Sequence, residues 1–355
     1  MMHRLIRRRQ SGVAVVTALL LTTLAITIVA SLFWQQQVQV RSIENQRFQL
    51  QKKWVLRGAL DWAGLILRED RRISKVDHLG EPWAVNLGDT RLDQYVENGR
   101  TEVEDSDATL SGQISDAQAK FNLTNLAVNG KVDIREQVVF SKLLSNLHLD
   151  PGLAQQVAVQ IAMTQERLLV GPENPGAPDT GQNPTGSKGS QTGSGAGGTK
   201  TTIGGGDSTV GLSTSSNSEV QFLKFSQIED LLAVPGFNPL IIARLRNFVT
   251  VLPRWTKINV NTTTAEVLSA RLENVNMSDA ALMIATRDRA YFLDFSRFKL
   301  NFPDKIKDTD VNFLEFQTNF FVVNGKVKLN RSLLEVDALL ERDDVGTRIL
   351  WIKEN

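Results

Sequence analysis

The chain of 355 residues contains no cysteine, which excludes disulfides, thiolate nucleophiles and zinc sites built on sulfur. The redox compartment stays open, because a protein of an oxidising compartment can lack disulfides. Only three histidines are present, and His78 and His148 have no sequence neighbour typical of a catalytic triad or a metal pair. A phosphate-binding loop and a dinucleotide fingerprint are also missing. These absences indicate a protein that is not an enzyme.

A strong excess of charge is missing as well. Forty basic and thirty-nine acidic side chains leave a formal net charge of +1. This balance argues against a general electrostatic attraction to nucleic acid or to anionic lipid. The hydrophobic fraction of 41% is sufficient for one or two ordinary cores in a chain of this length.

An apolar segment near the N-terminus predicts a membrane-spanning helix. Residues 13–33 carry no charge and would extend about 30 Å as a helix, which matches the thickness of a bilayer core. Four arginines precede the segment and a run of glutamines follows it. The positive-inside rule therefore predicts a cytoplasmic N-terminus, with the main body in the periplasm.

The residues before this segment resemble a prepilin leader. The sequence that follows the apolar run offers no small-x-small site for an ordinary signal peptidase. By contrast, residues 7–12 end in Gly12, and the resemblance implies that a prepilin peptidase cuts after this glycine and leaves Val13 as the first mature residue. An anchor that is never cleaved is the alternative.

The helix is expected to continue beyond the membrane, because residues 35–72 contain no proline. Five large apolar residues of this region fall within about 120° of one helix face. We call them the apolar stripe: Ile43, Leu50, Trp54, Trp62 and Leu65. The simplest expectation is that the apolar stripe packs on a sheet.

The rest of the chain alternates between strand and helix signals. Residues 109–123 predict one or two short strands, and helices are predicted for 134–147 and from 150 onward. Residues 171–218 are rich in glycine, serine and threonine and are expected to be a disordered loop. Short helices are then predicted for four further segments: 225–232, 238–249, 264–272 and 278–289.

The C-terminal part predicts antiparallel strands. Asn324-Gly325 separates two apolar segments, 316–323 and 326–329, which is a typical signal of a hairpin with a two-residue turn. Two more strands are expected at 333–340 and 347–352 around a polar turn.

Taken together, these features resemble the large minor pseudopilins of the type II secretion system, the K components. The resemblance extends over nearly the whole chain. Apart from the leader and the apolar run, it depends on residues 114–126 (ISDAQAKFNLTNL), 257–268 (KINVNTTTAEVL), 320–329 (FFVVNGKVKL) and 349–355 (ILWIKEN).

The resemblance implies an α+β fold, in which a membrane-spanning helix packs on an antiparallel sheet and a large all-α, helix-hairpin-helix-like domain is inserted. The implied domains are a leader (1–12), a transmembrane helix (13–33), the stalk helix and first part of the pilin-like body (34–125), the helical insertion (126–305) and the C-terminal strands (306–355).

The implied function is assembly rather than catalysis. Such a protein forms the tip of the periplasmic pseudopilus with the minor pseudopilins I and J and initiates its assembly for export across the outer membrane. The prepilin peptidase, the major pseudopilin and the inner-membrane assembly platform are further expected partners.

Thr17 is a candidate determinant of the tip position. It is the fifth residue counted from Val13, where most pilins carry a glutamate that pairs with the N-terminal amine of a neighbouring subunit. A carboxylate in hydrocarbon is costly without a partner, and a subunit at the tip has no neighbour ahead of it. Alternatively, Thr17 is an ordinary helix residue whose hydroxyl bonds back to its own helix.

No cofactor is required by this function, although the resemblance suggests calcium in the helical region, with ligands that cannot be assigned. Carboxylates gather at two places that could offer oxygen ligands: Glu102, Glu104, Asp105 and Asp107 in one cluster, and Asp343 and Asp344 in a turn. Solvated turn residues are the simpler interpretation of both.

A membrane-anchored periplasmic DNA-binding protein is the alternative function. Residues 232–237 (LAVPGF), followed by a helix at 241–245, look like half of a helix-hairpin-helix, a motif whose backbone amides approach phosphates. Arg244, Arg246 and Arg254 could contact phosphates. The second hairpin, residues 272–278, has no glycine and carries Glu273, which disfavours nucleic acid as a partner.

Overall fold

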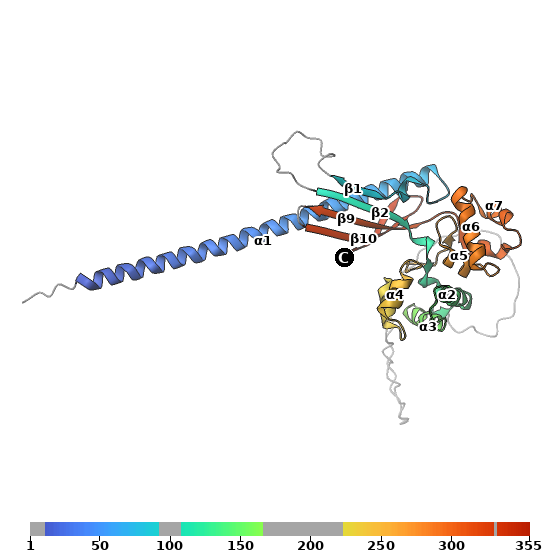
Figure 1. Ribbon diagram of the computed structural model, residues 1–355, viewed down its shortest axis with the longest axis horizontal. Coiled ribbons are helices and arrows are strands. Elements are labelled where there is room, and N and C mark those ends of the chain that lie inside the picture. The colour runs from blue at the N-terminus through green and yellow to red at the C-terminus, as the bar shows by residue number, and fades with distance from the viewer. Residues whose placement is uncertain (1–10, 92–107, 166–222, 330–331) are drawn as a thin grey trace, which may run out of the picture.

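The computed structural model describes residues 11–91, 108–165, 223–329 and 332–355. The expected disordered loop at 171–218 and the acidic cluster from Glu102 to Asp107 lie outside the described residues. Within them, the chain forms one very long helix, an antiparallel sheet and two groups of short helices (Figure 1). The α+β fold class predicted from the sequence is confirmed.

Helix α1 dominates the shape of the molecule. It covers Ser11–Ile73 without interruption, a total of 63 residues, and is about 95 Å long at the usual rise per residue. Within the described residues, α1 is long and apolar enough to cross a membrane, by length and composition. Arg71 and Arg72 occupy its last turn, where cations favour the negative end of the helix dipole.

Five strands of the described chain form the main sheet, in the order β1-β2-β9-β10-β11 with all neighbours antiparallel. The last third of α1 lies along one face of this sheet (Figure 1). The strands are β1 (Leu87–Arg91), β2 (Ala108–Asp116), β9 (Phe320–Leu329), β10 (Ser332–Arg342) and β11 (Thr347–Glu354). β10 and β11 confirm the two predicted C-terminal strands.

The residues of α1 that meet the sheet are not those of the apolar stripe. Leu56, Leu60, Ala63 and Leu67 are buried, and they pack against strand residues such as Phe321. Their spacing of four, three and four residues forms a second apolar face on the same helix. All members of the apolar stripe are exposed. The expectation that the stripe packs on the sheet is therefore wrong.

The predicted turn at Asn324-Gly325 is also wrong, because β9 passes straight through both residues and pairs with β10 along its whole length. Gly325 faces Gly112 of β2. A Cβ on Gly112 would lie 2.9 Å from the Asn324 carbonyl oxygen, and one on Gly325 would lie 3.3 Å from Leu56 Cδ1. Glycine stands at both positions because helix and strands approach closely there, rather than because the chain turns.

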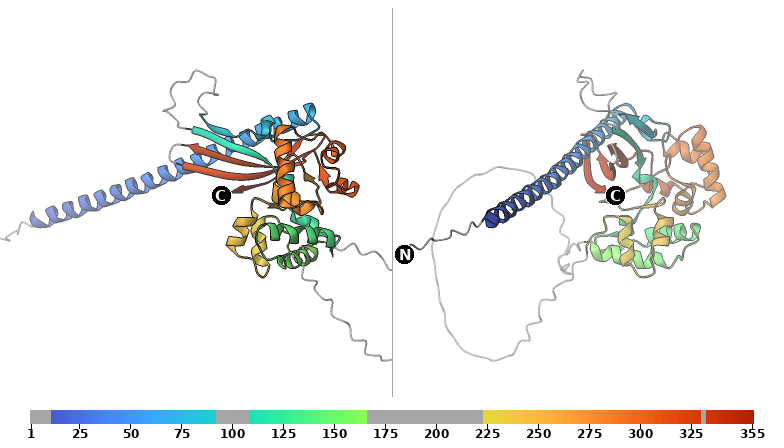
Figure 2. Two further views of the ribbon diagram at one scale, coloured as in Figure 1. Left: turned by 45° about the vertical axis from the view of Figure 1, so that its right-hand side comes forward. Right: turned by 60° about the vertical axis from the view of Figure 1, so that its left-hand side comes forward.

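The helices described between β2 and β9 form two groups, both at the end of the molecule opposite to the N-terminus of α1 (Figure 2). The first group comprises α2 (Ile134–Asn146), α3 (Leu153–Thr164), the 3₁₀ helix η5 (Ile228–Ala233) and α4 (Pro239–Leu245). The second comprises α5 (Ala265–Arg271), α6 (Met277–Arg289) and α7 (Phe295–Asn301). Each group is built around a hydrophobic core, and α5 contributes to both, through Val267 and Ala270 to the first and through Leu268 to the second.

The helix predictions differ in how well they hold. α2, α5 and α6 begin and end within two residues of their predicted positions. The segment predicted for 225–232 is a short 3₁₀ helix, α4 ends four residues early, and α7 was not predicted.

Short elements complete the described chain, one of them between α1 and β1 and the others between β2 and β9. They are the 3₁₀ helices η1 (Pro82–Ala84), η3 (Ala117–Ala119), η4 (Leu123–Leu126) and η6 (Asp308–Asn312), and the paired two-residue strands β3 (Phe121–Asn122) with β6 (Val249–Thr250), β4 (Ala127–Val128) with β5 (Lys131–Val132), and β7 (Ile258–Asn259) with β8 (Leu314–Glu315).

A buried ion pair joins the two helical groups. The guanidinium of Arg271, on α5, donates to both carboxylate oxygens of Glu136, on α2, at 2.6 and 2.8 Å. Both side chains are almost completely buried. A bidentate pair fixes both distance and orientation, so it holds the two groups in one arrangement.

Candidate functional site

The first candidate site is the exposed N-terminal part of α1. Gly12 and Val13 lie in its first turns, and Val13 is exposed. The Thr17 hydroxyl donates to the carbonyl oxygens of Val13 and Ala14, both at 3.0 Å. Hence Thr17 does bond back to its own helix in the isolated chain. Processing after Gly12 and a role of Thr17 at the filament tip stay predictions.

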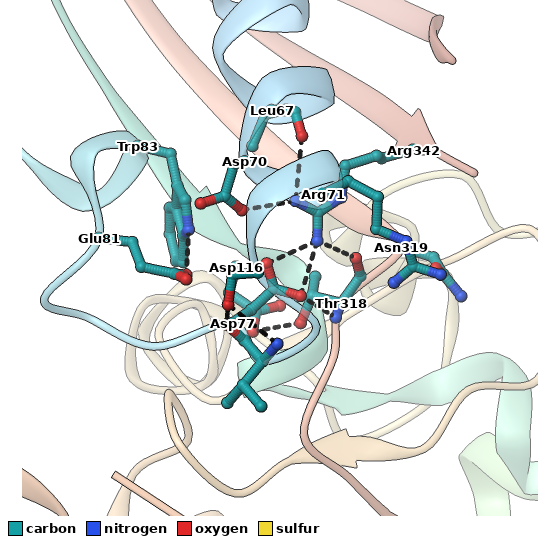
Figure 3. A network of polar contacts seen from close by, with 12 residues as sticks. Leu67, Asp70, Arg71, Asp77, Glu81, Trp83, Asp116, Thr318, Asn319 and Arg342 are labelled. Carbon is teal, nitrogen blue, oxygen red and sulfur yellow. Dashed lines mark hydrogen bonds and ion pairs between the residues drawn. The ribbon is translucent and has the colours of Figure 1, made fainter. Parts of the chain in front are cut away.

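The second candidate site is a buried charged cluster at the other end of α1 (Figure 3). Its centre is Arg342, from β10, which is 1% exposed. One guanidinium nitrogen, Nη1, donates to Asp70 Oδ2 at 2.8 Å, and the other, Nη2, donates to both oxygens of Asp77 at 2.5 and 2.6 Å. The guanidinium also lies 4.7 Å from the ring centre of Phe321. Arg342 thus connects the C-terminal end of α1, and the loop that follows it in the chain, to the sheet.

Two more carboxylates surround this centre. Glu81 Oε2 accepts hydrogen bonds from the Trp83 indole at 2.7 Å and from the His78 backbone at 2.9 Å. Asp116, at the end of β2, accepts from the Thr262 hydroxyl at 2.5 Å and from the Thr318 hydroxyl at 2.6 Å. Since Thr262 belongs to the inserted region, the cluster connects the sheet to the helical groups.

Two buried acids of this cluster, Asp70 and Asp116, have raised pKa values. Burial, together with the negative charges of Glu81 and Asp77, raises the pKa of Asp70 to about 7, although Arg342 opposes the shift. Burial likewise raises the pKa of Asp116 to about 6, despite the hydrogen bonds from Thr262 and Thr318. Near neutral pH Asp70 is therefore about half protonated, whereas Asp116 is mainly protonated only below about pH 6.

The cluster does not fit a calcium ion, although Asp70, Asp77 and Glu81 each offer an oxygen and these oxygens lie within 4.8 Å of one another. Calcium takes six to eight oxygen ligands. Here Arg342 already occupies the position of a cation, and it engages both oxygens of Asp77 and one of Asp70. No ligand role is therefore assigned to these acids.

The predicted acidic turn has a different use. Asp343 accepts from the backbone of Val345 at 2.9 Å and of Gly346 at 2.8 Å, which closes the turn between β10 and β11. Asp344 pairs with Arg71 at 2.9 Å. Both carboxylates are exposed in this turn, and calcium binding by them stays a hypothesis from the sequence.

The arginines named for DNA binding largely serve the fold. Arg246 pairs with Glu229 at 2.6 Å, and Arg254 pairs with the buried Glu341. The hairpin glycine, Gly236, has a φ of +90°, and a Cβ there would lie 2.7 Å from the Leu153 side chain. Thus the hairpin packs tightly on α3, and the glycine is explained without a phosphate ligand.

Sequence reasoning missed the charged cluster. Arg342 was assigned to a polar turn, and its acidic partners are separated from it by more than 200 residues. Asp116 is the one member of the cluster that the sequence could have indicated, because it lies in residues 114–126, one of the segments with the family resemblance.

Comparison with known proteins supplies the last observation. The family model described as "Type II secretion system (T2SS), protein K" matches residues 258–310, which include β7 and helices α5 to α7. Type II secretion system protein K of Pseudomonas aeruginosa is 26% identical over 97% of this chain and 92% of its own length. The protein of the same name from Pectobacterium carotovorum is 25% identical over 94% and 93%.

The predicted resemblance to the protein K family is confirmed. A solved structure of the GspK–GspI–GspJ complex from the type 2 secretion system of enterotoxigenic Escherichia coli contains a chain with the same fold, with a TM-score of 0.60 and 18% identity over 89% of this chain and 99% of that one. The similarity to the protein K family thus covers the sheet and the helical groups alike.

Proposed function

We propose that this protein is a minor pseudopilin that forms the tip of the periplasmic pseudopilus of a type II secretion system. It would associate there with the minor pseudopilins I and J and initiate filament assembly for protein export across the outer membrane. The observation that carries the proposal is the similarity to protein K over nearly the whole chain, combined with an exposed apolar helix at the N-terminus.

The membrane arrangement follows from α1. Residues 13–33 would span the inner membrane, with the N-terminus in the cytoplasm and the sheet and helical groups in the periplasm. The prepilin peptidase would cut after Gly12, and the helix that begins at Val13 would remain as the anchor. The mature chain would then enter the filament through the same helix.

The position of the helical groups supports a place at the tip. Both groups lie at the end of the molecule opposite to the N-terminus of α1 (Figure 2). In a filament whose helices point back to the membrane, they would occupy the space in which a subunit ahead would stand. Thr17 agrees with this position, because a subunit without a neighbour ahead has no amine to pair with a carboxylate.

An assembly role also agrees with the polar groups of the described chain. The buried network around Arg342 and the pair of Arg271 with Glu136 both join parts of the fold. Most of their polar atoms are paired within the described chain, as expected of structural networks, and the exceptions are Nε of Arg342 and Nε of Arg271. We therefore propose a function without catalysis.

Co-purification tests this proposal. The full-length protein, extracted with detergent from membranes that also contain the I and J minor pseudopilins, should bring down both. Secretion should fail when the gene for this chain is deleted and return when it is restored. Normal secretion in the deletion strain, together with a lack of co-purification, would contradict the proposal.

The side chain at position 17 offers a sharper experiment. Thr17→Glu should lower the amount of the complex with I and J, because an unpaired carboxylate within the membrane costs about 3 kcal/mol. Thr17→Val serves as the control and should leave the complex unchanged. A Thr17→Glu protein that assembles like the wild type would argue for a subunit with a neighbour ahead of it.

A further inference from the structure

A short piece of chain between α1 and β1 lies against the second helical group. We call residues 74–81 the connecting segment. Val76 packs against the hydrophobic core of that group. The ring of His78 stacks on the ring of Tyr291, which follows α6, with the ring centres 3.9 Å apart. The connecting segment therefore touches both the end of α1 and the helices of the inserted region.

Asp77 holds the connecting segment in place through its backbone and its side chain. Its N–H donates to the carbonyl oxygen of Phe316 at 2.8 Å, and its own carbonyl oxygen accepts from the Asn259 amide at 3.1 Å. Its carboxylate accepts from the Thr318 N–H at 2.6 Å and from Arg342 of β10. Asp77 thus joins the sheet to the inserted region, and we call this set of contacts the joint.

The charges at the joint do not balance unless a proton is bound. Oxygens of Asp70, Asp77 and Glu81 lie within 4.8 Å of one another, and one guanidinium, that of Arg342, donates to two of these acids. Carboxylates this close in a buried place do not all ionise, because each negative charge raises the pKa of the others. A proton bound by one of them relieves the repulsion.

Asp70 is the member that holds the proton, because its charge is the least stabilised. Among the described residues its carboxylate accepts one hydrogen bond, from Arg342. By contrast, Glu81 accepts from the Trp83 indole and from the His78 backbone, and Asp77 accepts from Thr318 as well as from Arg342. Hydrogen bonds to a carboxylate favour its ionised form.

The remaining neighbours of the joint do not supply the missing positive charge. Asp116 accepts only from neutral donors of the described chain, among them the Asn259 amide at 3.0 Å. Arg71 is engaged by Asp344. The titratable and charged groups around Asp70 are Asp77, His78, Glu81, Asp116 and Arg342.

We propose that the proton on Asp70 locks the joint, so that the attachment of the second helical group to the sheet depends on the pH of the surroundings. When the proton leaves, a new negative charge stands beside Asp77, the residue that connects the two parts. The repulsion favours an open joint, in which the connecting segment separates from its partners and Asp70 reaches water. This property goes beyond the proposed function and does not depend on it.

Hydrogen exchange of the full-length protein in detergent tests the proposal directly. The informative amides are those of Asp77 and Thr318, since both donate across the joint. After correction for the intrinsic pH dependence of exchange, their rates should rise about tenfold between about pH 6 and about pH 8 and then level off. This ratio is expected for an acid whose pKa is about 7 in the closed joint and returns to its usual 3.8 on opening. Equal corrected rates at both pH values would overturn the proposal.

Asp70→Asn imitates the protonated acid, because its amide oxygen can still accept from Arg342. Its corrected rates should change by less than about twofold over the same range, since the amide does not titrate. Asp61→Asn is the matched control: it removes an exposed acid from the same helix and should keep the full rise. A full rise in Asp70→Asn would overturn the proposal.

Glu81→Gln separates a proton lock from a merely structural contact. The variant removes one of the negative charges that raise the pKa of Asp70. The rise in exchange should therefore begin and end at a lower pH than in the wild type. A rise at the wild-type pH would show that the charges of the cluster do not hold the proton, and would overturn the proposal.

Discussion

The two halves of α1 are similarly helical, yet their surroundings differ completely. Residues 13–51 are exposed on every side. Further along the same helix, Leu56, Leu60 and Leu67 are buried against the sheet. The first half of the helix therefore leaves its apolar side chains uncovered in this chain, whereas the second half supplies part of the core. Both halves of the helix carry apolar side chains. The two halves differ in whether the sheet covers those side chains.

The chemistry at the two ends of the helix differs in the same way. Near the N-terminus, hydroxyls such as that of Thr17 bond only to the backbone of their own helix. Near the C-terminus, Asp70 enters the charged cluster around Arg342, which connects the helix to the sheet. The described N-terminal hydroxyls thus tie their residues only to their own helix, whereas the C-terminal end is fixed to the sheet.

Removal of Arg342 should have the largest effect on the free energy of unfolding, because it releases the fixed end of α1. Arg342→Met would leave Asp70 and Asp77 buried without their cation, and loss of one partner of a buried ion pair costs about 3–5 kcal/mol. The free energy of unfolding, measured by chemical denaturation of the detergent-solubilised protein, should fall by about this amount.

Arg72→Ala is the control for that experiment. Arg72 pairs with Glu69 at the surface of the same helix, where water screens the two charges, so its removal should leave the free energy of unfolding nearly unchanged. Equal effects of the two variants would show that the buried cluster does not fix the end of α1.

Shortening one side chain on each apolar face of α1 should show which face belongs to the core. Leu60→Ala, on the sheet side, should lower the free energy of unfolding by about 2–5 kcal/mol, because it leaves a cavity in the core. Leu65→Ala, on the apolar stripe, should change it by about 0.5 kcal/mol or less. The same denaturation experiment measures both. A Leu65→Ala protein as unstable as Leu60→Ala would place the stripe in the core after all.

The smallest expected effect is a pH dependence at the charged end. The pKa of Asp70 is raised from its usual 3.8 to about 7. Through this window the folded protein holds a proton that the unfolded chain releases, so this group's contribution to stability is lost as the pH rises toward 7. Asp116, whose pKa is raised to about 6, acts in the same direction.

The measurement is the melting temperature at about pH 5 and about pH 8, for the wild type and for Asp70→Asn. The wild type should lose more stability than the variant between the two conditions, because the amide does not titrate. Identical pH dependence in the two proteins would contradict the raised pKa of Asp70.

Much of the fold could be predicted from the sequence where a segment has one dominant pattern. The uncharged run of α1 and the alternation in β10 and β11 gave the correct elements, as did the helical period of α2. Prediction failed where two explanations fit the same residues. Asn324-Gly325 is typical of a turn, but Gly325 is required by the approach of Leu56, a contact that only the tertiary structure reveals.

The same limit applies to the candidate sites. The apolar stripe was recognised, but the sequence could not tell which of two apolar faces meets the sheet. The charged cluster was missed because Arg342 meets Asp70 and Asp77 only after the chain has returned from the helical groups. Long-range pairs of this kind leave no local pattern in the sequence.

The central claim is that α1 is a processed pilin-like helix, and its N-terminus tests this most directly. Mass spectrometry of the protein purified from membranes, with and without the prepilin peptidase, would identify the first residue. The account predicts a mature chain that begins at Val13 and an uncut leader when the peptidase is absent. A chain that keeps its leader in the presence of the enzyme, or that begins near Trp34, would contradict it.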